Sequence, residues 1–466
     1  MPDGSMPTTV DAFPIGGPAQ VFSLKPGSAR KPTIARGEGI YIWDTSGRRY
    51  IDASSGPVAF NLGYGNKRVI AAMKAQLDVA AFAHPSQFES AANIELAGLV
   101  AKHAGTGLER VWFCSGGSEA VEGAIKFARQ HAVAIGQSKR WKVLSRMPAY
   151  HGNTLGALAL TGDQNAHDLF GPMMRLMPKV PTPVTYRLPP NHTAESWARH
   201  CAAEVERTII AEGAESVLAF ILEPVGGLAT GALVSPDVYL EQVREICTRR
   251  GVLLIFDEVI TGAGRTGAFL AADHTPKARP DLVVMAKGLS GGYMPLGAVL
   301  APAHMVATVA SMGGFMHGHT YQSNPLACAV GVAAVSETIE RDLIGNARRM
   351  GAILRPRLQQ LADHSAVVGD VRGKGLLFAL ELVASKAAKS QIPTETPAPA
   401  QFIMHALDQG LSVYSRRTNR GTDGDWVMVA PPLIVTEDEI DMIVVGLQRT
   451  VRAYEAALTR DGVKFG

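Results

Sequence analysis

Two apolar stretches that end in ionisable residues decide the fold: LLIFDEV (residues 253–259) and DLVVMAK (residues 281–287). Neither stretch has an alternating polar face, which predicts strands buried on both sides, as in a parallel sheet covered by helices. Further short apolar runs lie at residues 111–115, 142–146, 217–224 and 297–302, and helical patterns lie at 118–130 and 239–250. This alternation predicts an α/β fold with a mostly parallel central sheet.

The chain is expected to form two core-forming units, because its 466 residues exceed the usual size of one hydrophobic core. Residues 1–70 are predicted to form an N-terminal arm and part of a small domain. Residues 71–329 are predicted to form a large domain. Residues 330–466 would complete the small domain, which is of α+β type.

The two ends of the chain carry local patterns of their own. Residues 40–52 (IYIWDTSGRRYID) predict a β-hairpin, residues 67–77 predict a helix, and the first residues, rich in Pro, Gly, Ser and Thr, predict a loose arm. Towards the C-terminus, VGDVRGKGLLFALEL, LSVYSR and WVMVAPPL predict strands. The Pro/Ala/Thr-rich residues 392–400 predict a loop, and Thr436 is expected to begin a final helix that runs to about Leu458.

Composition excludes several classes of function. Lys plus Arg is 45 and Asp plus Glu is 42, and the resulting charge of +3 is too small to indicate nucleic acid or an anionic membrane as partner. The four cysteines are widely spaced and form no CxxC pair, which argues against a disulfide framework and a zinc site. We expect a cytoplasmic protein without a metal, since the N-terminus does not resemble a signal peptide and no apolar run could span a bilayer.

The first candidate site element is the turn SGGSE (residues 115–119), between a predicted strand and a predicted helix. Exposed amides at a helix N-terminus favour a bound phosphate, and Gly116 and Gly117 let a ligand approach the backbone closely. Ser118 is placed to cap the helix. The alternative interpretation is a tight turn with a serine cap and no ligand.

Three further side chains lie at or just beyond strand ends. Asp257 is at the carboxyl edge, where open α/β sheets bind ligands, and could hold a ring nitrogen protonated. Lys287 ends an apolar strand, and its amine could form a Schiff base with an aldehyde. Tyr150, in YHG (residues 150–152), could stack on a flat ring. Taken singly, each has an ordinary explanation: an acid that caps a turn, a lysine that reaches the sheet edge, and a loop tyrosine.

Together the four elements match one cofactor, pyridoxal 5′-phosphate. The helix N-terminus would hold the phosphate, Asp257 the pyridine nitrogen, Tyr150 a ring face and Lys287 the aldehyde. An acid on the ring nitrogen keeps the ring an electron sink for the carbanion formed at the substrate carbon. Once released by an incoming amine, Lys287 could move the proton between that carbon and the cofactor.

A dinucleotide site is the competing interpretation of GAGRTG (residues 262–267), which matches GxGxxG after a strand. A dinucleotide fold would need a helix of some length there, but only AFLAADH precedes Pro276. Asp257 and Glu258 would also place negative charge just before the pyrophosphate loop. The pattern therefore argues against this reading.

The motifs SGGSEAVEGAIKFAR, YHGNTLGA, ILEPV, LLIFDEVITGAGRTGAF, DLVVMAKGLSGGYMPLGAV and HGHTYQSNPLACA occur in this order. In this series the chain resembles, over nearly its whole length, the class III aminotransferases of pyridoxal-phosphate fold type I. The DEVITG version is most similar to the ω-transaminases, or amine:pyruvate transaminases. The resemblance implies a large domain with helices on both faces of a mostly parallel sheet, and a smaller α+β domain made from both chain ends.

The resemblance also implies roles for individual residues. Lys287 would be the Schiff-base lysine and Asp257 the partner of the pyridine nitrogen, with Val259 and Tyr150 on opposite ring faces. Where relatives often have SGS, this chain has Gly116, which can offer only its amide. Thr320 would reach the phosphate of the neighbouring subunit, which implies a homodimer or higher homo-oligomer. The implied cofactor-binding residues are Gly116, Gly117, Ser118, Tyr150, His151, Glu223, Asp257, Val259, Lys287 and Thr320.

The substrate pocket is less defined by the resemblance. Relatives that act on ornithine or γ-aminobutyrate carry an arginine where this chain has Met428, which argues against a carboxylate switch through Glu223. The ω-transaminases use a mobile arginine slightly earlier in the chain. The candidates are Arg416, Arg417 and Arg420, and for each the alternative is a solvated loop residue. The candidate pocket walls are Pro57, Phe60, Phe82, His84 and Leu228, and packing is an equal explanation for each.

We therefore expect a ping-pong aminotransferase that moves an amino group from an amine or ω-amino acid to a keto acid, with pyruvate as the first candidate. One alternative is an aminomutase or decarboxylase that uses the same cofactor and turns over a single substrate. An alternative of another class is a non-catalytic regulatory protein that binds pyridoxal phosphate.

Overall fold

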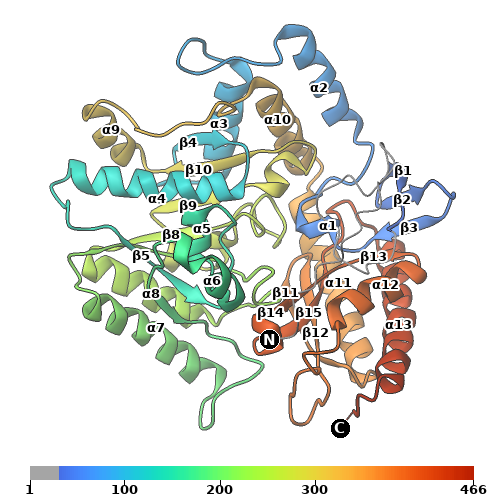
Figure 1. The fold of residues 1–466 in the computed structure, drawn as a ribbon. Helices are drawn as coiled ribbons and strands as arrows, with labels where there is room; N and C mark the ends of the chain where they lie inside the picture. The colour runs from blue at the N-terminus through green and yellow to red at the C-terminus, as the bar shows by residue number, and fades with distance from the viewer. Residues whose placement is uncertain (1–30, 466) are drawn as a thin grey trace, which may run out of the picture.

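A computed structural model describes residues 31–465, so the predicted N-terminal arm lies largely outside the described residues. The central sheet has seven strands in the order β4-β10-β9-β8-β7-β5-β6 (Figure 1). The pairs from β9 to β6 are parallel, and β10 is antiparallel to both neighbours, which confirms a mostly parallel sheet. The strands are β4 (Arg110–Cys114), β5 (Lys142–Met147), β6 (Lys179–Pro181), β7 (Val217–Leu222), β8 (Leu253–Asp257), β9 (Leu282–Met285) and β10 (Gly297–Ala301).

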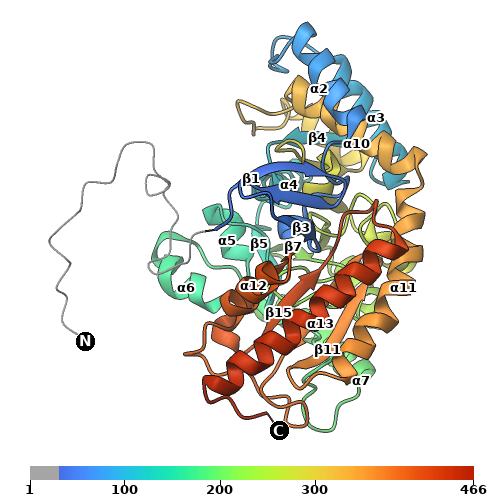
Figure 2. The same cartoon turned by 90° about the vertical axis from the view of Figure 1, so that its right-hand side faces the viewer.

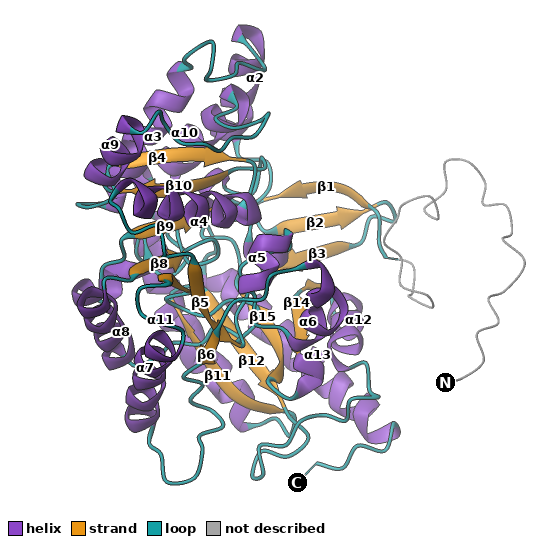
Figure 3. Cartoon of the chain, turned by 60° about the vertical axis from the view of Figure 1, so that its left-hand side comes forward, coloured by secondary structure: helices purple, strands orange, loops and turns teal. Residues whose placement is uncertain are grey.

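Helices cover both faces of this sheet (Figure 3). Alternate residues of a strand point to opposite faces. In β7, Phe220 packs with α3, α7, α8 and α10, whereas Ile221 packs with α4, α5 and α9. Burial on both faces explains why the strands lack a polar side. The helices are α3 (Ala91–Ala104), α4 (Gly117–Ala134), α5 (Leu155–Leu160), α7 (Ala194–Ala211), α8 (Asp237–Arg250), α9 (Ala303–Ser311) and α10 (Pro325–Glu340).

Two smaller sheets are built from the ends of the chain. One is antiparallel, in the order β11-β12-β15-β14, and the other has the order β1-β2-β3-β13, where β13 runs parallel to β3. The second sheet contains the predicted hairpin and joins both chain ends, whereas the boundaries at residues 70 and 330 stay a prediction. The strands are β1 (Ile34–Glu38), β2 (Tyr41–Asp44), β3 (Arg49–Asp52), β11 (Val368–Lys374), β12 (Leu377–Leu382), β13 (Leu411–Ser412), β14 (Tyr414–Thr418) and β15 (Gly424–Val429).

The remaining helices flank these sheets or connect elements (Figure 2). The predicted final helix is confirmed, with the Thr436 hydroxyl accepting from the amide of Glu439. Every helix within residues 31–465 is too short or too polar to cross a membrane. These elements are α1 (Ser55–Val58), α2 (Lys67–Val79), α6 (Gln164–Phe170), α11 (Leu343–Asp363), α12 (Ala398–Asp408), α13 (Glu437–Arg460), η2 (Gly171–Met173), η3 (Ala271–His274), η4 (Pro276–Ala278), η5 (Lys287–Ser290) and η6 (Asn419–Gly421).

Two local predictions need correction. Residues 392–397 form the predicted loop, but residues 398–400 begin α12, because the first turn of a helix tolerates Pro399, whose missing N–H has no helical partner to lose. Ser118 does not cap α4: Gly116 is the N-cap residue, and Ser118 lies inside the first turn. Its hydroxyl instead accepts a hydrogen bond from the Asn153 amide. The argument against a dinucleotide site is confirmed, since turns and the short η3 follow β8.

Candidate active site

A cavity of about 270 Å³ lies beyond the carboxyl ends of β8 and β9. This is the edge at which open α/β sheets bind ligands. Most of the residues predicted to contact the cofactor come together in its lining, namely Gly117, Ser118, Tyr150, His151, Glu223, Asp257, Val259 and Lys287.

Asp257 is held in a fixed orientation at the end of β8. Its Oδ2 atom lies 2.8 Å from Nδ1 of His151, and its Oδ1 accepts a hydrogen bond of 3.1 Å from the Val259 amide. Both side chains of the Asp257–His151 pair are buried. A carboxylate can accept about four hydrogen bonds, so Asp257 can still accept one from a protonated ring nitrogen.

Lys287 lies two residues beyond the end of β9, as the first residue of η5, rather than at the strand end itself. Its backbone has φ 47°, a strained conformation for a non-glycine residue of the kind found at functional sites. Burial lowers the pKa of the Lys287 amine to about 8, although Asp257 and Glu223 oppose this shift. A larger share of the amine is therefore neutral and nucleophilic near neutral pH than for an exposed lysine.

The N-terminus of α4 opens into the same cavity. Within the described residues, no side chain caps this helix end, which leaves its first amides available to an anion. A Cβ atom added at Gly117 would lie 3.0 Å from a methyl group of Val259, so glycine is what allows the close approach of these segments. The geometry suits a small phosphate group.

The carboxylate of Glu223 connects two loops around the cavity through hydrogen bonds. Its Oε1 accepts from the Gly227 amide at 2.8 Å and its Oε2 from the Tyr150 amide at 3.2 Å. Burial raises the pKa of this carboxyl group, and the nearby Asp257 charge adds to the rise. Each oxygen of Glu223 accepts one backbone hydrogen bond, and these bonds tie its carboxylate to both loops.

The three candidate arginines lie in different environments. Arg417 binds Asp425 through Nε at 2.7 Å and Nη2 at 2.8 Å, and belongs to the packing of the small sheet. Arg420 is 73% exposed. Only Arg416 approaches the cavity, with its guanidinium carbon 5.3 Å from the centre of the Tyr150 ring.

Only some of the residues predicted to form the pocket walls line the cavity. Pro57 and Leu228 line the cavity. Phe60 packs on Tyr293, 5.1 Å between ring centres, and does not belong to the lining. Also outside the lining are Phe82, His84, Gly116 and Thr320. Tyr414, Val225 and Ile260, which line the cavity, were not singled out from the sequence, because nothing in an apolar strand or loop marks the residue that faces a cavity.

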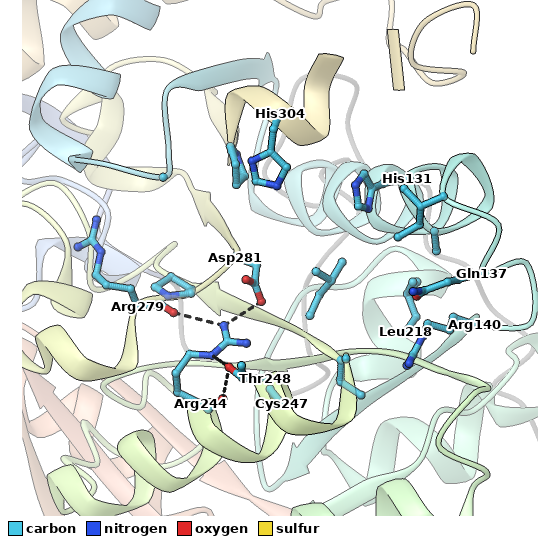
Figure 4. A pocket seen from close by; sticks show the side chains of 18 of the residues that line it. His131, Gln137, Arg140, Leu218, Arg244, Cys247, Thr248, Arg279, Asp281 and His304 are labelled. Atoms are coloured by element: carbon cyan, nitrogen blue, oxygen red, sulfur yellow. Dashed lines mark hydrogen bonds and ion pairs between the residues drawn. The ribbon is translucent and has the colours of Figure 1, made fainter. Parts of the chain in front are cut away.

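A larger cavity of about 860 Å³ lies at the opposite, amino-terminal edge of the sheet (Figure 4). Its arginines are already engaged by the chain itself. Arg244 donates to Asp281 at 2.8 Å and to the Arg279 carbonyl, whereas Arg140 donates to the carbonyls of Ala214, Val217 and Arg250. These side chains are explained by packing, so the smaller cavity remains the candidate active site.

Comparisons with known proteins agree with this site. The profile of the family described as Aminotransferase class-III matches residues 26–451. An uncharacterized aminotransferase of Bacillus subtilis is 35% identical over 444 residues, covering 94% of this chain and 99% of that protein. The putrescine–pyruvate aminotransferase of Pseudomonas aeruginosa is 32% identical, covering 88% of each chain.

The crystal structure of an ω-transaminase from Pseudomonas jessenii in complex with PMP superposes with a TM-score of 0.86 at 33% identity, covering 93% of this chain and 96% of that one. The fold is therefore that of the fold type I transaminases. The chain belongs to the class III aminotransferases, a family of pyridoxal-phosphate-dependent enzymes that transfer amino groups.

Proposed function

We propose that this aminotransferase moves an amino group from an amine or ω-amino acid to pyruvate by a ping-pong mechanism. The observation that supports this most strongly is one cavity in which Lys287, Asp257 and Tyr150 meet apolar walls, with Arg416 at the margin. In such a mechanism the donor and the acceptor occupy the same cavity in turn, so the walls must accept an apolar group and a carboxylate at different times.

The residues present fit pyridoxal phosphate. When bound, this cofactor supplies an aldehyde that takes up the amino group and a ring that withdraws electrons from the reacting carbon. Gly117 and Ser118 at the uncapped start of α4 would hold the phosphate. Asp257 would hold the ring nitrogen, and Lys287 would carry the aldehyde carbon.

Lys287 would then act as the proton carrier of the reaction. Its amine is buried, and burial brings its pKa to about 8, near the working pH of most enzymes. A general base works best when its pKa lies near the operating pH. Freed by the incoming amine, Lys287 would take a proton at one carbon and return it at another, while the walls exclude water.

The walls support an apolar donor. Val225, Leu228 and Ile260 line the cavity and belong to one buried apolar cluster. Met428 lies in the same cluster, fully buried, where an arginine would otherwise offer charge. Apolar walls bind the alkyl or aryl part of an amine by removing it from water.

The choice of keto-acid acceptor rests on the number of arginine side chains near the cavity. Among residues 31–465, no arginine belongs to the cavity lining, and Arg416 at the margin can serve one carboxylate. A keto acid with a single carboxylate matches this, whereas a dicarboxylate would leave one charge without a partner at a cost in desolvation.

The test is a donor panel offered to the holoenzyme with pyruvate or with 2-oxoglutarate. We expect alanine from pyruvate, and faster turnover than with 2-oxoglutarate. Bleaching of the cofactor absorbance band by each donor separates the donor half-reaction from the acceptor half-reaction. Absence of alanine across a broad panel of simple amines and ω-amino acids would contradict the proposal.

A homodimer is the assembly that the surface supports. The helices α2, α3 and α10 pack together (Figure 2). Exposed apolar side chains lie on α2, on α3 and in the segments after α2 and before α10. Phe82 and Tyr321 lie 6.2 Å apart between ring centres, and Thr320 beside them is exposed. Patches of this kind mark protein interfaces. We call this surface the apolar end face; it comprises Val79, Phe82, Phe88, Ile94 and Tyr321.

A further inference from the structure

Arg416 is held at the edge of the cavity by an acid from another part of the chain. Its Nη2 donates to Oδ2 of Asp163 at 2.7 Å, while its guanidinium carbon lies 5.3 Å from the centre of the Tyr150 ring. Tyr150 lines the cavity but Arg416 does not. The arginine is therefore next to the substrate space and already paired with an anion.

The carboxylate of Asp163 is fixed by the helix that it caps. As the N-cap residue of α6, its Oδ1 accepts from the amides of Asn165 at 3.0 Å and Ala166 at 3.4 Å. This leaves Oδ2 to Arg416. The Asp163 side chain therefore loses little conformational entropy when it pairs with Arg416, unlike a typical surface acid.

Hydrogen bonds also join the two backbone segments that carry Asp163 and Arg416. The Gln164 amide donates to Oδ1 of Asn419 at 2.8 Å, and Nε of Arg420 donates to Oδ1 of Asn165 at 2.8 Å. These contacts tie the start of α6 to the turn that follows Arg416. Arg416 can thus leave Asp163 by rotation of its side chain, without movement of either segment.

We propose that Asp163 is a specificity-determining residue, which competes with the carboxylate of the substrate for the guanidinium of Arg416. This inference rests on the proposed function, in which an amine and a keto acid use one cavity in turn. While Arg416 stays on Asp163, the cavity presents its aromatic and apolar walls to an amine that carries no carboxylate. A carboxylate substrate binds only by displacing Asp163, so the strength of this pair sets the balance between the two kinds of substrate.

The test measures binding of propanoate, an unreactive analogue of pyruvate, and of neutral propanamide to the holoenzyme by calorimetry. Asp163→Asn removes the charge but keeps a good N-cap residue for α6. We expect propanoate to bind roughly three- to tenfold more tightly to this variant, the range for loss of one competing ion pair, with propanamide unchanged. Asp168→Asn on the same helix is the matched control. It removes the same charge from a side chain that contacts Gln164 and Arg420 rather than Arg416, keeps an amide oxygen for these contacts, and should change the binding of neither ligand.

Arg416→Gln should weaken propanoate binding, and adding Asp163→Asn to it should have no further effect. The inference is overturned if Asp163→Asn leaves propanoate binding unchanged, or if Asp168→Asn produces the same change, which would indicate only the loss of a distant charge. Alanine formation by the unaltered enzyme is scored separately. Its absence would contradict pyruvate as acceptor, whereas the propanoate comparison needs no turnover.

Discussion

The imidazole of His151 and the carboxylate of Asp257 form a buried pair in the lining of the active-site cavity, 2.8 Å apart between Nδ1 and Oδ2. An ionised carboxylate only accepts hydrogen bonds, so the imidazole of His151 donates from Nδ1. This bond fixes the plane of the Asp257 carboxylate, and with it the direction from which a ligand can reach the other oxygen. Asp257 is thus oriented by contacts within the protein itself, which is the condition for effective electrostatic stabilisation.

Asp257→Asn should retain the cofactor but lower kcat by about a hundredfold or more, because a neutral amide cannot hold the ring nitrogen protonated. Alanine formation gives the rate, and absorbance gives the bound cofactor. His151→Asn, which removes only the orienting partner, should cause a smaller loss. A near-normal rate for Asp257→Asn would exclude the assigned role.

Lys287→Ala should abolish both turnover and the absorbance band of the covalently held cofactor, with the fold retained. Alanine keeps the same Cβ atom at φ 47°, so the backbone strain is not increased. Circular dichroism checks the fold, and borohydride reduction followed by mass spectrometry checks the covalent link. A cofactor adduct on another lysine would refute the assignment.

In the apoenzyme, the buried Lys287 amine should lower the free energy of unfolding by an amount that depends on pH. Burial lowers the pKa of its amine from 10.5 to about 8, so between these values the unfolded chain binds more protons and stability rises with pH. Relative to Lys287→Ala, the apoenzyme should therefore lose about 3 kcal/mol at pH 7, and this difference should fade between pH 8 and 10.5. Urea unfolding of both apoproteins across this range measures it; a pH-independent difference would count against a buried, charged Lys287.

Val79→Glu should dissociate the proposed homodimer and reduce activity. Val79 is 80% exposed on the apolar end face, so the change should leave the monomer folded but place a charge in the interface. Light scattering measures the mass. Val445→Glu on α13, also exposed but on another part of the surface, is the control and should leave the assembly intact. An unchanged mass for Val79→Glu would locate the interface elsewhere, or argue for a monomer.

Much of the fold was predictable because its signals are local. Short apolar runs predicted every strand of the central sheet except β6, a three-residue edge strand too short to stand out. The start of α4 was misassigned because glycine and serine are both good residues at helix starts, and the choice between Gly116 and Ser118 depends on where the loop at Asn153 lies.

The amino-acid sequence by itself predicted which residues meet at the candidate site, since an acid at the end of one buried strand and a lysine just beyond the end of the next lie at the same edge of a parallel sheet. It could not choose among the arginines. Arg416 and Arg417 are neighbours in β14, and successive strand residues point to opposite faces. Which face meets the cavity depends on how β14 pairs with β15 and where α6 packs, both contacts between distant parts of the chain. Tertiary structure alone therefore placed Arg416 beside Tyr150 and supplied Asp163 as its partner.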